Sequence, residues 1–163
     1  MNAKETKAWF GGKTFNAYFA LQLLLAYVCL SHLVLGGLAF VSLPEPLAAS
    51  IIKWNYGAII DLTPSLVHVI RIVGAYMIAM GVLAGLASMN PSRNRAVIWG
   101  IILLLLLRVA QRFIFFNEIQ EAFGITTVRL LVQSAHFSAI AIGLLLLLRK
   151  ASGSGSDPAL QSG

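Results

Sequence analysis

The sequence predicts an all-α membrane protein, a bundle of four transmembrane helices. Hydrophobic residues make up 58% of the 163 residues and charged residues only 11%, against roughly a quarter in ordinary soluble domains. Four long apolar runs stand out, and roughly twenty apolar residues are enough to cross a bilayer. Because these runs use most of the chain, residues 1–150 are expected to form one membrane domain, with no room for a soluble catalytic domain.

The first predicted span covers residues 16–41. Basic residues precede it, as in a signal peptide, but its apolar segment exceeds the roughly 7–15 residues of a signal core and no AxA-like cleavage site follows. We therefore expect a retained helix. The next stretch, residues 42–63, contains Pro44 and Pro46 and is too broken to span. With Trp54 and Tyr56, it is expected to lie along the outer interface.

The second predicted span covers residues 64–89. It opens with Thr63 and Pro64, a capping residue followed by a proline at the first helical position. The sequence Asn90-Pro91-Ser92 is a turn signal that ends the helix.

The third predicted span covers residues 96–116, or continues to residue 123 before Gly124, a candidate helix C-cap. The fourth covers residues 127–148. Residues 151–163 are rich in Gly and Ser and low in apolar residues, which predicts a flexible cytoplasmic tail.

Four spans place both termini on one side of the membrane. The loops and termini of that side carry Lys4, Lys7, Lys13, Arg93, Arg95, Arg149 and Lys150. The opposite side carries Lys53 together with Glu45, Asp61, Glu118 and Glu121. Basic residues concentrate on cytoplasmic loops, so both termini are expected in the cytoplasm, with the chain in a bacterial inner membrane.

Small residues predict where the helices approach one another closely. The second span carries the pair Gly81 and Gly85, and the fourth repeats Ala135, Ala139 and Gly143 every four residues. We expect these positions to pack helices of one chain together rather than to form a dedicated dimer interface.

All four spans bring polar residues to the outer half of the membrane, where a charge facing hydrocarbon is costly. The spacing within each span puts its polar residues on a shared face. The candidate ligand-binding residues are Arg71, Arg108, Gln111, Arg112, Arg129, Gln133 and His136.

Three interpretations of this cluster remain open. The arginines could be neutralised internally by Asp61, Glu118 and Glu121. They could form an anionic site for a phospholipid head group, a carboxylate or a quinone carbonyl, since arginine offers a fork of donors to such oxygens. Redox or transport chemistry is the third interpretation, although no span has an internal proline and no inverted repeat is visible.

Histidines on three different spans raise the question of a b-type haem. The candidate axial ligands are His32, His68 and His136, since such a haem takes ligands from facing helices. Lone membrane histidines more often hydrogen-bond between helices, so haem is the less favoured cofactor and quinone the more favoured one.

Other sites are not expected. The sequence has no nucleophile-elbow, metalloprotease, P-loop or dinucleotide-binding pattern, so the chain on its own is not expected to be an enzyme. The only cysteine, Cys29, excludes an intrachain disulfide. The carboxylates sit in loops, which argues against a metal site, and the charges form no single basic patch for nucleic acid.

Residues 68–113 read HVIRIVGAYMIAMGVLAGLASMNPSRNRAVIWGIILLLLLRVAQRF. This stretch, with Arg-x-x-Gly-Ala, a small-residue helix, a Pro/Arg turn and a second arginine-bearing helix, resembles the DoxX-like group of small four-helix bacterial membrane proteins. The resemblance implies a four-helix bundle with Arg71 and Gly74 at the family's Arg and Gly positions. Because some DoxX proteins look like membrane subunits of quinone-linked sulfur oxidation, it also favours quinone as a ligand.

These observations predict a small accessory subunit, structural or assembly-related, of a larger energy-transducing membrane complex. Membrane lipids are the other expected partner. The alternative is a free-standing protein that binds a quinone, an anionic lipid or a b-type haem through the polar cluster.

Overall fold

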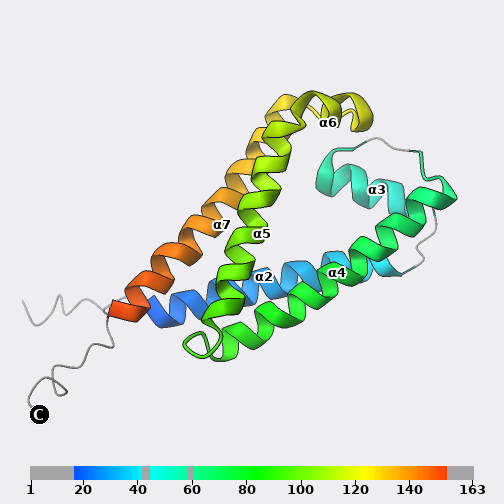
Figure 1. Cartoon of the computed structure of the whole chain (residues 1–163). Helices are drawn as coiled ribbons and strands as arrows, with labels where there is room; N and C mark the ends of the chain where they lie inside the picture. Colours follow the sequence, from blue (N-terminus) through cyan, green and yellow to red (C-terminus); the bar gives the residue numbers. More distant parts are fainter. Residues whose placement is uncertain (1–16, 42–44, 59–60, 154–163) are drawn as a thin grey trace, which may run out of the picture.

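The computed structural model describes residues 17–41, 45–58 and 61–153, which are mostly helical and contain no strand. Six helices follow one another along the chain (Figure 1): α2 (Ala17–Phe40), α3 (Glu45–Tyr56), α4 (Pro64–Met89), α5 (Arg95–Ile114), α6 (Phe116–Phe123) and α7 (Thr127–Gly153). The helices α2, α4, α5 and α7 are long and apolar enough to cross a membrane. The predicted all-α class with four spans is confirmed.

The helix ends follow the expected ones closely, with two differences. The third span stops at Ile114, and α6 begins after a single residue, Phe115, whose φ of −106° and ψ of 35° leave the helical region. Helix α7 continues to Gly153, and the fourth span on it ends at Ala151 rather than at residue 148. Residues 151–153 of the predicted tail are therefore helical, while residues 154–163, like the basic N-terminal arm, lie outside the described residues.

The predicted helix caps are present. The Thr63 hydroxyl accepts a hydrogen bond of 3.3 Å from the backbone N–H of Leu66, and Pro64 opens α4. Gly124 ends α6 in the left-handed conformation, with φ of 62°, and its N–H donates to the Gln120 carbonyl at 2.9 Å. A left-handed residue at this position favours glycine because it has no Cβ.

The spans form two pairs that diverge. Helix α2 packs along α4, and α5 packs along α7. The two pairs meet at the end of the molecule that holds Ala17 and the end of α7, and they spread apart toward α3 and α6 (Figure 1). In the hydrophobic window of each span only 22–28% of residues are buried, so most of the apolar surface faces outward, as in a membrane protein.

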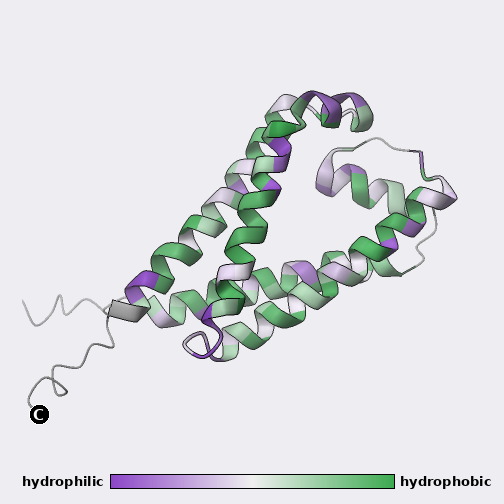
Figure 2. Cartoon of the chain, viewed as in Figure 1, coloured by the Kyte–Doolittle hydropathy of each residue, from purple (hydrophilic) through white to green (hydrophobic). Residues whose placement is uncertain are grey.

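Two apolar cores lie at opposite ends of this wedge. The larger core fills the closed end and includes Leu25, Ala84, Leu105 and Leu144, one from each span. The smaller core joins the α3 end, α6 and the start of α7 around Ala58, Ile125 and Leu130. Figure 2 shows polar segments within the upper, otherwise apolar part of α5 and at α6. The space between the two cores is where the polar residues of the spans meet.

Close packing of α2 on α4 depends on glycines. A Cβ on Gly81 would lie 2.9 Å from Leu33 Cγ, and one on Gly85 would lie 3.1 Å from Cys29 Sγ. The backbones approach most closely at Gly74, where an added Cβ would lie 2.7 Å from the Phe40 nitrogen and 2.9 Å from the Gly36 carbonyl oxygen. An added Cβ on Gly36 would in turn lie 2.9 Å from the Gly74 carbonyl oxygen. These positions allow the two backbones to touch.

The predicted stripe on α7 behaves differently. A Cβ on Gly143 would lie 3.1 Å from the Leu24 side chain of α2, so Gly143 does face a neighbouring helix. Ala135 and Ala139 are exposed instead. The buried residues of α7 include the small Ala141 as well as the larger Ile140 and Leu144, so the packing face lies a fraction of a turn away from Ala135 and Ala139.

Candidate functional site

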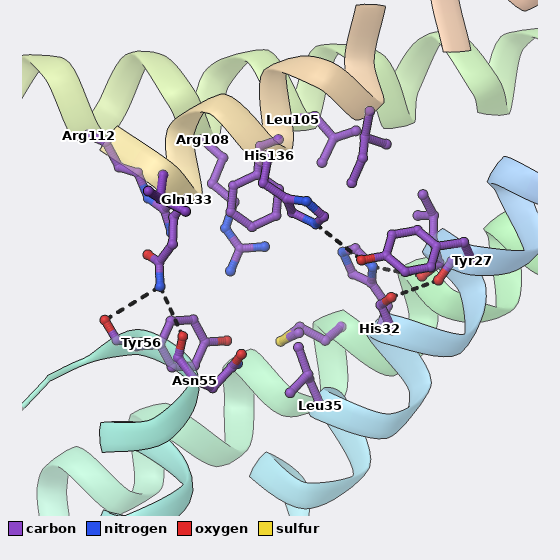
Figure 3. Close-up of a pocket in the computed structure, with 16 residues that line it drawn as sticks. Tyr27, His32, Leu35, Asn55, Tyr56, Leu105, Arg108, Arg112, Gln133 and His136 are labelled. Atoms are coloured by element: carbon purple, nitrogen blue, oxygen red, sulfur yellow. Dashed lines mark hydrogen bonds between the residues drawn. The ribbon is translucent and has the colours of Figure 1, made fainter. Parts of the chain in front are cut away.

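A polar recess opens between the two helix pairs, directly beyond the larger core. Its volume is about 310 Å³, and it begins about one turn after the buried Leu105, at Arg108 (Figure 3). Its polar lining comes from α2, α3, α5 and α7 and consists of Tyr27, Ser31, His32, Asn55, Tyr56, Arg108, Arg112, Gln133 and His136. We call this cavity the polar recess.

Two arginines of α5 carry the charge of the polar recess. The guanidinium carbons of Arg108 and Arg112 lie 4.9 and 4.8 Å from the ring centroid of Phe137 on α7. The two arginines are four residues apart and share one face of α5. Cation–π contacts of this kind contribute about 0.5–2 kcal/mol each. Phe137 therefore holds both guanidinium groups at the same wall, and Figure 3 shows Arg108 extending into the space between the helices.

In the described part of the chain, no acidic side chain neutralises these two charges. Among the described residues, no Asp or Glu lines the polar recess, and neither Arg108 nor Arg112 forms a salt bridge. One nitrogen of Arg112, Nη1, is buried without a hydrogen-bond acceptor in the described part of the chain. The expected internal partners Asp61, Glu118 and Glu121 are exposed instead. The described geometry thus gives no support to internal ion pairing of Arg108 and Arg112.

Tyr27, His32 and His136 also line the polar recess. The Tyr27 hydroxyl and His136 Nε2 share a hydrogen bond of 3.1 Å, and His32 Nδ1 lies 2.9 Å from the Val28 carbonyl oxygen. A carbonyl oxygen only accepts, so His32 Nδ1 carries the proton of that bond. His32 is only 7% exposed, whereas His68 is exposed and does not line the recess.

Two predicted ligand residues hold α3 in place. The Gln133 side-chain amide donates to the carbonyl oxygens of Asn55 at 2.9 Å and Tyr56 at 3.5 Å. The Arg129 guanidinium donates to the Trp54 carbonyl oxygen. The last carbonyls of a helix lack intrahelical partners, and a cation there is favourable. Arg129 and Gln133 therefore fasten the C-terminal end of α3 to α7, and Arg129 does not line the recess.

An apolar groove continues from the polar recess between the helix pairs. Its volume is about 730 Å³ and its walls come from all six described helices. Most lining residues are aliphatic, and no described Asp or Glu is among them. Arg71 and Gln111, both predicted site residues, lie on this wall. The recess and the groove share lining residues, among them Tyr56, Arg108 and Arg112.

The sequence did not single out four residues that shape this site as members of it. Tyr27 lies one turn before Ser31 on α2, and Phe137 directly follows His136. Asn55 and Tyr56 come from the segment expected only at the interface. A tyrosine at i−4 of a polar residue was a usable signal for Tyr27, but nothing in the sequence indicates that Phe137 lies beside both arginines.

The arrangement is suited to binding an anion rather than a metal. The described residues contain no group of three or more His, Cys, Asp and Glu side chains that could hold a metal ion.

No protein-family model, curated protein or solved structure matches the chain. Its resemblance to the DoxX-like group stays a prediction, and four spanning helices identify the chain as a multi-pass integral membrane protein.

Proposed function

We propose that this protein binds one membrane amphiphile between its two helix pairs, with an anionic head group in the polar recess and an apolar chain in the groove. The observation that carries the proposal is the meeting of Arg108 and Arg112 in a cavity whose described lining contains no carboxylate.

The electrostatics of the recess favour an anion. Arginine stays charged under all ordinary conditions, and an uncompensated charge inside a span costs several kcal/mol. Tertiary packing normally satisfies such charges by pairing, yet the described partners of Arg108 and Arg112 are a phenyl ring. An anionic head group would supply the missing charge and the acceptor oxygens.

The shape of the cavities favours an amphiphile. Small-molecule sites have volumes of about 300–1,000 Å³ with mostly apolar walls and a few placed polar groups. The polar recess, at about 310 Å³, and the apolar groove, at about 730 Å³, meet at shared walls. A molecule with a polar head group and a hydrocarbon chain would fill the recess with its head group and the groove with its chain. Such a molecule would enter between the two helix pairs from the surrounding bilayer.

Other occupants from the sequence analysis fit the charges less well. A quinone carbonyl would accept a hydrogen bond from an arginine but would leave both positive charges in place. A haem would need free imidazole nitrogens from facing helices, and His136 Nε2 is hydrogen-bonded to Tyr27. In an accessory subunit of an energy-transducing complex, a partner helix would fill the wedge, but an apolar helix brings no anion to Arg108.

The proposed orientation places the recess in the outer half of a bacterial inner membrane, with both termini cytoplasmic. In its support, the turn between α4 and α5 and the end of α7 lie at the closed end (Figure 1) and carry Arg93, Arg95, Arg149 and Lys150. The start of α4 and helix α6 lie toward the open end; Asp61 precedes α4, Glu118 and Glu121 belong to α6, and Lys53 belongs to α3 nearby. Positive residues favour the cytoplasmic side. The head group would then come from the outer leaflet.

Thermal stability with added amphiphiles tests the proposal. The delipidated protein is titrated with phosphatidylglycerol or with phosphatidylcholine of the same acyl chains. A ligand that binds the folded state stabilises it by about 2.7 kcal/mol at one hundred times its Kd. We expect phosphatidylglycerol to raise the melting temperature of the wild type but not of the Arg108→Gln/Arg112→Gln variant.

The matched control is Arg93→Gln, which removes an exposed charge at the turn between α4 and α5. This variant is expected to respond as the wild type does. Equal stabilisation by the two lipids, or an undiminished response in the double variant, would contradict the proposed function.

A further inference from the structure

We infer that the head group bound in the polar recess is a phosphate monoester, a step that rests on the proposed function and names its ligand class. The structural basis is the number of uncompensated charges at one wall. Arg108 and Arg112 contribute two, both beside the Phe137 ring, and no described acidic residue lines the recess.

Charge matching separates the candidate head groups. A phosphate monoester carries a charge of about −1.5 to −2 at pH 7 and three strong acceptor oxygens. A phosphodiester, a sulfate ester or a carboxylate carries a single negative charge. A singly charged head group would leave one of the two guanidinium charges uncompensated in the recess, and an unpaired buried charge is strongly destabilising.

Hydrogen-bonding capacity leads to the same class. Each guanidinium carries five N–H donors in a planar fork that suits phosphate oxygens. The Tyr56 side chain also lines the recess, whereas the Ser31 hydroxyl already donates its hydrogen bond to the Tyr27 carbonyl oxygen at 2.7 Å. The three terminal oxygens of a monoester offer more acceptor positions to this donor-rich wall than a diester, which has only two unesterified oxygens.

The hydrocarbon part of such a ligand has a path out of the recess. Leu35 and Met77 line both the polar recess and the apolar groove, so the two spaces adjoin along an apolar wall as well as at the arginines. Both a glycerolipid and a polyprenyl chain could follow this path. The shared chemistry is the terminal phosphate group.

The test compares two lipids that differ by one methyl group. Phosphatidic acid is a monoester, and phosphatidylmethanol with the same acyl chains is a diester with a single charge. Delipidated full-length protein is mixed with equal amounts of both lipids, and the bound species are counted by native mass spectrometry. We expect one lipid per chain and a preference for phosphatidic acid of about tenfold or more, since hydrogen bonds to charged groups contribute about 1.5–3 kcal/mol.

Single substitutions supply an independent readout. In Arg108→Gln and in Arg112→Gln one positive charge remains, so the preference for phosphatidic acid should fall to within about threefold of unity, a difference below 1 kcal/mol. The Arg93→Gln control should keep the wild-type preference. A polyprenyl phosphate added as a third competitor identifies the source of the monoester, and stronger binding of either monoester supports the inference.

The outcomes separate the two proposals. One outcome is equal binding of phosphatidic acid and phosphatidylmethanol to the wild type, with binding of both lost in the Arg108→Gln/Arg112→Gln variant. This result would overturn the monoester inference but support the proposed site for an anionic amphiphile. Two bound diesters per chain would also overturn the monoester inference, because two singly charged head groups would then neutralise Arg108 and Arg112. Binding of neither lipid would overturn both proposals.

Discussion

Two adjacent glycines on α2 make a sharp test of the helix pairing. A Cβ added at Gly36 would lie 2.9 Å from the Gly74 carbonyl oxygen, the Ile78 nitrogen and Met77 Cβ. A Cβ added at Gly37, one residue later, would meet nothing within 4 Å. Gly36→Ala should therefore push α2 and α4 apart, and Gly37→Ala should not.

The magnitude follows from the contact distances. Carbon atoms in favourable contact are about 3.5–4.0 Å apart, so two backbones must separate by several tenths of an ångström to accept the Gly36 methyl group. Overpacking of this kind costs about 1–3 kcal/mol. Alanine is about 1 kcal/mol better than glycine in a helix interior, and this gain applies to both variants. The difference in unfolding free energy between Gly36→Ala and Gly37→Ala should thus be about 1–3 kcal/mol.

Unfolding in mixed micelles, titrated with a denaturing detergent and followed by far-UV circular dichroism, measures this difference. Gly37→Ala should match or exceed the stability of the wild type. Equal stabilities for the two alanine variants would refute the close approach of α2 and α4 at Gly36.

Three further substitutions test the site and its support. Arg112→Leu should keep or raise the melting temperature, because the buried Nη1 has no described acceptor. Removing an unpaired donor avoids a cost of about 1–3 kcal/mol. A large drop in the melting temperature would instead indicate that Arg112 forms an ion pair. Gln133→Leu should increase amide hydrogen exchange at the C-terminal end of α3, because the hydrogen bonds from Gln133 to Asn55 and Tyr56 are removed. Exchange in α5 should stay slow. Unchanged exchange at the end of α3 would contradict the role of Gln133 in holding α3 against α7. Gly57→Ala should lower the free energy of unfolding by about 1–2 kcal/mol, because its left-handed φ of 73° disfavours a side chain. The control Gly100→Ala, whose added Cβ would lie in open space, should not lower it.

The positions of the spans could be predicted because the bilayer imposes them. A helix needs roughly twenty apolar residues to cross, and the sequence marks the ends of α4 with Thr63 and a proline turn, and the end of α6 with Gly124. These signals are local, so a single sequence contains them completely. The interruption at Phe115 has no such local signal, and it appears only in the structure.

The partners of each helix could not be predicted in the same way. In a span that is apolar all round, the face toward lipid and the face toward protein look alike. The spacing placed Arg108 and Arg112 on one face, but it could not show that Phe137 faces them. It also could not show that Arg129 turns to the Trp54 carbonyl instead of the recess, because that depends on where α3 docks.

The most direct test of the central claim is native mass spectrometry of the chain extracted from its own membranes in mild detergent, with the bound lipid identified. We predict one anionic amphiphile per chain that survives activation sufficient to strip annular lipid, and that is lost in the Arg108→Gln/Arg112→Gln variant. A chain that retains no amphiphile, or a stoichiometric assembly with other subunits in which no lipid accompanies the chain, would contradict the account and favour the accessory role.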